Sequence, residues 1–202
     1  MKIKHITPLV VALACSQSAL AEIKTLKVDK KNDLKEVMTG YSIVGEGESE
    51  KVETEGSEVP QIKTVQNDPE GGDGKSDGGV KINSMTTGGQ FGAQMLLGKA
   101  GEKNGKLSLS THVFNVNSSY VKYEVQFYNK TDKKVLATSG VKMLEPKKKV
   151  LDETIKLDYK LTKDDLGDEI FVRWVQLSTD STARDIYVDN VSVVASEVEA
   201  KK

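Results

Sequence analysis

Residues 120–129, YVKYEVQFYN, decide the fold. Every second residue from 121 to 127 is a large apolar one (Val121, Tyr123, Val125 and Phe127), and most of the residues between them are polar. A period of two belongs to a β-strand that buries one face. We therefore expect residues 121–127 to present this apolar face to the core. Tyr120, Gln126 and Tyr128 should then share the opposite face.

Neighbouring stretches repeat this alternation. KLSLSTHV (106–113) and TIKLDYKL (154–161) have the same period, and the polar turn NKTDKK (129–134) joins 120–129 to VLATSGV (135–141) as a hairpin. Only LTKDDLGD (161–168) indicates a helical turn, because Thr162 and Asp165 have capping-box spacing. The chain is therefore predicted to be all-β, an antiparallel β-sandwich of jelly-roll type with at most one short helical turn.

Residues 185–194, DIYVDNVSVV, change phase in the middle of a strand-like run. The apolar positions Ile186 and Val188 precede Asp189-Asn190, whereas Val191 and Val193 follow them in the other phase. Either both faces of this strand are buried or one residue is bulged out. We favour a bulge at Asp189-Asn190, since both residues are poor strand formers.

The stretch EIFVRWVQL (169–177) has apolar residues on both faces, as a central strand requires. Trp174 shares its phase with Ile170 and Val172, which predicts that its side chain lies in the core. Arg173 then faces outward.

The first 21 residues, MKIKHITPLVVALACSQSALA, have the order of a secretory signal peptide. Two lysines precede a short apolar run, and Ala19-Leu20-Ala21 supplies a cleavage site. We expect secretion to the periplasm or the exterior, with a mature chain that begins near Glu22. Lipid anchoring at Cys15 is the alternative, which we disfavour because Ala12 stands where the lipid-attachment motif needs Leu.

Composition narrows the classes of function. The single cysteine leaves with the signal peptide, which excludes disulfides, a thiol nucleophile and a thiolate metal site from the mature chain. The net charge is −1 and lysines are scattered, so no nucleic-acid-binding stripe is expected. No segment after the signal is apolar enough to span a membrane.

The remaining chain suits a single sandwich domain, residues 22–195, followed by a polar tail, 196–202. Within it, residues 45–79 are crowded with Glu, Asp and Gly and predict a long loop with one short strand around 61–65.

The last part of the chain resembles galactose-binding-like jelly rolls, the sandwich of carbohydrate-binding modules in secreted bacterial proteins. The similarity rests on a Thr-x-x-Asp-x-Gly turn, an apolar strand and a closing Asp-Asn-Val strand, represented here by Thr162, Asp165, Gly167, Ile170, Val172, Asp189, Asn190 and Val191. The resemblance implies a non-catalytic protein that recognises a polysaccharide or another glycan. It also implies a structural calcium at Asp189, with a purely structural bulge as the alternative.

Sugar binding needs aromatic faces together with amide, carboxylate or guanidinium partners. The face with Tyr120, Gln126 and Tyr128 offers such a platform, and Arg173 is a candidate neighbour. Half-exposed tyrosines also occur on sheets that bind nothing.

Two other classes of function remain open: a surface, matrix or adhesion protein that uses the sandwich for protein contacts, and a jelly-roll polysaccharide lyase or glycosidase. For the enzyme, His112 is the only mature histidine, and Arg173 and Arg184 are the only arginines. No acid/base arrangement is recognisable, so we expect no catalytic activity.

Overall fold

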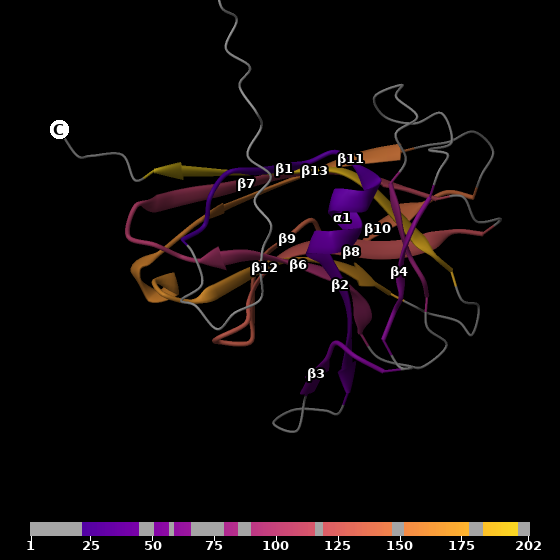
Figure 1. The fold of residues 1–202 in the computed structure, drawn as a ribbon, viewed down its shortest axis with the longest axis horizontal. Helices are drawn as coiled ribbons and strands as arrows, with labels where there is room; N and C mark the ends of the chain where they lie inside the picture. Colours follow the sequence, from indigo (N-terminus) through magenta and orange to yellow (C-terminus); the bar gives the residue numbers. More distant parts are fainter. Residues whose placement is uncertain are drawn as a thin grey trace, which may run out of the picture.

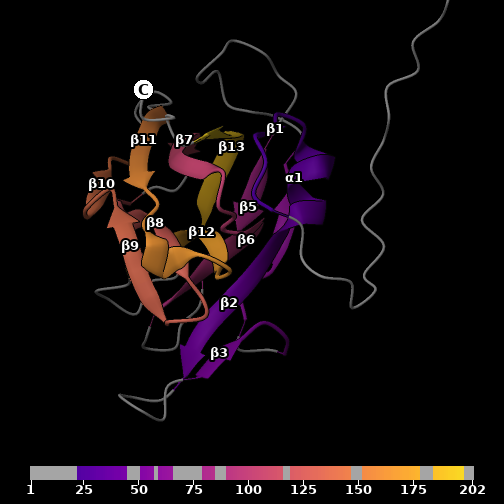
Figure 2. The ribbon, with the colours of Figure 1, turned by 90° about the vertical axis from the view of Figure 1, so that its left-hand side faces the viewer.

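Two antiparallel β-sheets pack face to face in the computed structural model, which describes residues 22–44, 51–56, 59–65, 79–84, 90–115, 119–146, 152–177 and 184–197. Figures 1 and 2 show the two layers from perpendicular directions. The predicted β-sandwich is confirmed. The predicted signal peptide (residues 1–21, with Cys15), residues 198–202 and most of the acidic region 45–79 lie outside the described residues.

The larger layer, called sheet A, has seven strands in the order β10-β8-β12-β6-β2-β3, and β9 also pairs with β8. These strands are β2 (Met38–Val44), β3 (Lys51–Glu53), β6 (Phe91–Lys99), β8 (Val121–Asn129), β9 (Lys134–Thr138), β10 (Lys142–Leu144) and β12 (Glu169–Gln176).

The other layer, sheet B, has six strands in the order β11-β7-β13-β5-β4, and β1 also pairs with β13. Its strands are β1 (Leu26–Val28), β4 (Ile62–Thr64), β5 (Val80–Ile82), β7 (Asn104–Phe114), β11 (Asp152–Lys160) and β13 (Ile186–Glu197). The first and last strands of the described chain are therefore neighbours. β4 confirms the short strand expected near 61–65, whereas β3 is an additional one.

Alternation places the core between the sheets, as expected for a sandwich. The odd-numbered residues of β8 from Val121 to Phe127 are buried and pack with Trp174, which is completely shielded from solvent. The inward position predicted for Trp174 is thus confirmed, and Arg173 lies on the other face of β12.

One helix was not anticipated. Helix α1 (Lys31–Val37) buries only Leu34 among its residues and contacts β2, β4, β5 and β13. A seven-residue helix is marginal in isolation, so its stability comes from this tertiary contact. A single apolar anchor leaves no helical periodicity to detect in the sequence.

The bulge predicted in the last strand is present. Asp189 is opposite His112 and Ser192 is opposite Ser110, so β13 holds one more residue than β7 over this interval. Asn190 has a φ of 49°, and its backbone N–H and side-chain amide both donate to the Asp189 carboxylate. The left-handed conformation inserts the residue, and Val188 and Val191 both remain buried.

The predicted helical turn is a 3₁₀ helix at Lys163–Asp165 with a capping box between Thr162 and Asp165. One Asp165 oxygen accepts hydrogen bonds from the Thr162 N–H and hydroxyl, each 2.7 Å long, and from the Tyr159 hydroxyl at 3.0 Å. Burial, with a further contribution from the Asp165 hydrogen bond, raises the pKa of Tyr159 to about 12.

Replacing Asn190 tests the bulge. Asn190→Val should lower the free energy of unfolding by about 1–2 kcal/mol relative to Asn190→Gly, because a β-branched residue tolerates a left-handed φ poorly and glycine tolerates it well. Urea unfolding of both variants measures the difference. Ser192→Val, at a regular position two residues later, is the control. Equal stability of the Val and Gly variants would contradict the assigned conformation.

Tyr159→Phe tests the turn through pH. The folded pKa lies above the usual value of 10.0, so the unfolded state loses this proton first. The tyrosine's contribution is complete below pH 10 and is lost as the pH rises toward about 12. Between these values the stability of the native protein should fall more steeply than that of Tyr159→Phe. Parallel slopes in urea titrations would refute the assignment.

Candidate functional site

A row of polar side chains crosses the outer face of sheet A, the face turned away from the core. Arg173 on β12 is opposite Gln94 on β6 and Gln126 on β8. The same register continues to Thr39 on β2 and to Thr138 on β9. We call these five residues the polar row. Because neighbouring strands lie about 4.8 Å apart, the row spans about 19 Å across the sheet.

An apolar row runs beside it, one pair further along the strands. Phe171 is opposite Leu96 and Tyr128, and Tyr128 is opposite Val135. Leu96 and Val135, at the two ends, are 36% and 42% exposed, whereas Phe171 and Tyr128 are buried. The outer face thus presents adjacent polar and apolar strips that run across the strands.

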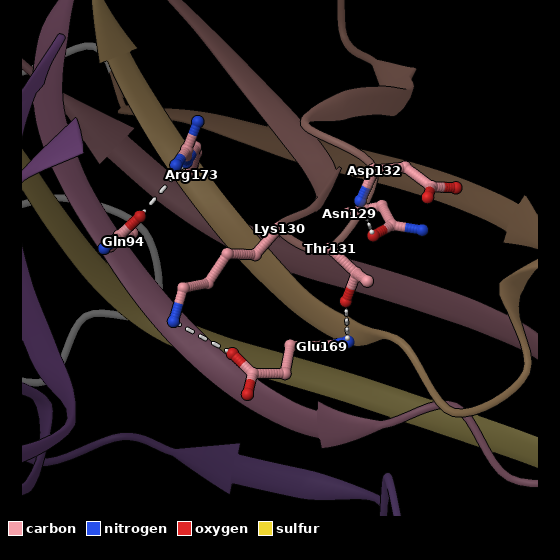
Figure 3. A network of polar contacts seen from close by, with 7 residues as sticks. All are labelled: Gln94, Asn129, Lys130, Thr131, Asp132, Glu169 and Arg173. Carbon is pink, nitrogen blue, oxygen red and sulfur yellow. Dashed lines mark hydrogen bonds and ion pairs between the residues drawn. The ribbon is translucent and has the colours of Figure 1, made fainter. Parts of the chain in front are cut away.

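Arg173 is the centre of the polar row and is only 2% exposed. Its Nε donates to Gln94 Oε1 at 3.1 Å, and Figure 3 shows the two side chains meeting from neighbouring strands. The guanidinium carbon lies 3.4 Å from the centroid of the Tyr128 ring and 4.5 Å from that of Tyr41. Cation–π contacts with two tyrosines therefore stabilise a cation that has lost most of its hydration.

Tyr41, on β2, adds a buried phenol to this cluster. Its ring is fully shielded, and none of the described residues provides a hydrogen-bond partner for its hydroxyl. Burial raises the pKa of Tyr41 well above its usual value, although the Arg173 charge acts in the opposite direction. The hydroxyl consequently stays protonated at neutral pH and is a donor in need of an acceptor.

Glu124 completes the polar chemistry of this face. It lies two residues from Gln126 on β8 and is half-buried, and one of its carboxylate oxygens accepts a hydrogen bond from the Gln126 amide. A guanidinium, a carboxylate, two amides and two phenols thus gather within a few strands. This is a set of groups that can hydrogen-bond to sugar hydroxyls.

The β8–β9 turn fastens this face to the start of β12 (Figure 3). Asn129 Oδ1 accepts from the Asp132 N–H at 3.0 Å, and Thr131 Oγ1 accepts from the Glu169 N–H at 3.2 Å. Lys130 forms an ion pair of 3.0 Å with Glu169. These contacts fix the strands that carry Tyr128 and Arg173 relative to each other.

The structure brings together three of the four residues predicted to bind a sugar: Gln126, Tyr128 and Arg173. Tyr120 precedes β8 and lies eight residues from Tyr128, about 27 Å along an extended strand. One face of the Tyr128 ring contacts the guanidinium, so this ring supports Arg173. Gln94 and Tyr41 were missed by sequence reasoning, because only strand pairing places them beside Arg173.

Asp189 and His112 lie on the outer face of the other sheet. Asp189 is buried and bonded to Asn190, and His112 lies 3.4 Å from the Thr154 hydroxyl. Within the described ranges, no group of three or more His, Cys, Asp or Glu side chains is arranged to hold a metal ion. Calcium at Asp189 remains a prediction. In the described part of the chain no helix is long and apolar enough to cross a bilayer.

Solved structures share this fold. The Stig cyclase Fisc from Fischerella sp. TAU superposes with a TM-score of 0.55 at 16% identity, over 87% of this chain and 100% of the other. The CBM22-1 xylan-binding domain of Paenibacillus barcinonensis Xyn10C gives 0.51 at 12% identity, over 89% and 98%.

The CBM22-1 and GH10 modules of the Clostridium thermocellum xylanase 10B, complexed with xylohexaose, give 0.51 at 14% identity, over 87% of this chain and 29% of the other. No protein-family model matches the sequence, and no curated protein matches it either. Identities this low show a shared sandwich, which occurs both in carbohydrate-binding modules and in enzymes.

Arg173→Ala should reduce the free energy of unfolding by about 2–4 kcal/mol, because both cation–π contacts and the bond to Gln94 are lost. Lys122→Ala, which removes an exposed cation on the same face, is the matched control and should change stability by less than about 0.5 kcal/mol. Chemical denaturation measures both. If the two variants unfold alike, the guanidinium is not the centre of the cluster.

Proposed function

We propose that this protein is a secreted, non-catalytic glycan-binding protein whose site is the polar row with its neighbouring apolar row. The observation that carries the proposal is the register of five polar side chains across five adjacent strands, with Arg173 at the centre. A linear polysaccharide has hydroxyl edges and less polar ring faces, which match adjacent polar and apolar strips.

The side chains of the two rows differ in burial, and we assign them different roles accordingly. Arg173, Gln94 and Tyr128 are buried and set the shape and charge of the face. Thr39 and Thr138, at the two ends of the polar row, are exposed and positioned to meet the ligand first. The row's length of about 19 Å suits several consecutive sugars rather than a monosaccharide.

The shared fold supports xylan as the first polysaccharide to test, because two of the similar sandwiches are described with xylan or xylohexaose. A non-catalytic role accords with the position of His112. It lies on sheet B, whereas the arginine–tyrosine cluster lies on the outer face of sheet A.

The test is affinity electrophoresis of the purified protein in gels that contain xylan, alginate, pectin or host glycans. If the polysaccharide binds at the polar row, the double variant Thr39→Ala/Thr138→Ala should bind it about tenfold more weakly than the native protein. Two hydrogen-bonding positions are lost, while the buried cluster is untouched. Ser110→Ala/Thr154→Ala, on the outer face of sheet B, is the matched control and should bind normally.

Other outcomes assign the protein to the competing classes. Binding that survives the double variant would move the site elsewhere. A panel without any binding would favour the protein-contact role. Turnover that vanishes in His112→Ala would move the assignment to the lyase class.

A further inference from the structure

Exposed apolar side chains gather at the start of β8 and along β10. Tyr120, Val141 and Met143 are 45%, 63% and 57% exposed, which places them among the most exposed large apolar residues of the described chain. Met143 is opposite Lys122, and alternation puts Tyr120 and Val141 on the same outer face as this pair. We call these three residues the apolar annex.

The apolar annex is continuous with the polar row. Glu124 lies between Lys122 and Gln126 on the outer face of β8, and it accepts a hydrogen bond from Gln126. The β9–β10 connection is held against the same point, because the Ser139 N–H donates to the Val125 carbonyl at 2.9 Å and the Ser139 hydroxyl accepts from the Val125 N–H at 3.0 Å. The annex therefore extends from the Gln126–Thr138 end of the row, along β8 and β10 and at right angles to the row.

Side-chain hydrogen bonds hold the backbone beneath the annex. The side-chain amide of Asn115, a residue only 2% exposed, donates to the carbonyls of Ser119, Leu144 and Glu145 at 2.9, 3.2 and 2.9 Å. Arg184 Nη1 donates to the Tyr120 carbonyl at 2.7 Å. Both segments of the annex are fixed while their apolar side chains stay in water, an arrangement that lowers the ordering cost of binding.

We propose that the apolar annex binds an aryl substituent carried by the glycan at the polar row. The inference rests on the proposed function and names the class of ligand more closely: a substituted rather than a plain polysaccharide. Val141 and Met143 have no flat face on which a sugar ring can stack, but their aliphatic surfaces suit an apolar group, and methionine adapts to its shape. Exposed contiguous apolar surface commonly marks such contacts.

Two matched probes test the annex: the methyl and 4-nitrophenyl β-glycosides of xylotriose, titrated into the full protein by NMR. The nitrophenyl compound should bind about tenfold more tightly and shift the backbone signals of residues 120–124 and 141–143, because its ring leaves water. Val141→Ser/Met143→Ser should abolish this preference. Val194→Ser, an exposed apolar position on β13 in sheet B, is the control and should retain it.

Equal affinity for the two glycosides, no binding of either, or a preference that survives in the double variant would overturn the proposal. These outcomes are separate from failure of the proposed function. Polysaccharide binding that needs Thr39 and Thr138 but not Val141 and Met143 would support the polar row as the binding site and remove the annex. A nitrophenyl preference without any polysaccharide binding retains the annex and removes the proposed function.

Discussion

The outer face of sheet A is organised around one desolvated cation. Arg173 projects from β12 and is only 2% exposed, because the side chains of neighbouring strands, Tyr41 and Tyr128 among them, pack against its guanidinium. A buried charge is costly unless it is paired or hydrogen-bonded. The two tyrosine rings and Gln94 provide that stabilisation, and they come from three different strands. The requirement to stabilise Arg173 therefore fixes the identities of its neighbours.

Strand register places the polar residues of neighbouring strands beside Arg173, in a strip that crosses the sheet. Side chains that are opposite one another on neighbouring strands lie on the same face, so a polar residue at one position of each strand becomes a strip at right angles to the chain. Register shifts at Ile170/Phe171 and at Phe127/Tyr128 lie beside the cluster. A slip of one residue would place the charged Arg173 in the apolar core and turn Trp174 toward solvent, and both changes cost free energy.

The outer faces of sheets A and B differ in chemistry because their buried polar groups have different partners. On sheet B, the left-handed Asn190 corrects the phase of β13, and the buried Asp189 carboxylate is engaged by that same residue. This bulge keeps Val188 and Val191 in the core and provides a structural reason for an Asp-Asn pair within a strand. On sheet A, by contrast, the buried polar groups cluster across several strands around Arg173.

The sequence by itself determined the local structure of this protein. Alternation over 121–127 and 154–161 predicted strands, the phase change at Asp189-Asn190 predicted the bulge, and the spacing of Thr162 and Asp165 predicted the turn, because each depends on residues a few positions apart. The same alternation predicted that the Trp174 side chain points inward and the Arg173 side chain outward. Only the tertiary structure decided which strands are neighbours: it brought Tyr41 and Gln94 to Arg173, left Tyr120 outside that cluster, and stabilised helix α1 through Leu34. Contacts between residues far apart in the chain depend on strand order and register, which no short-range pattern encodes.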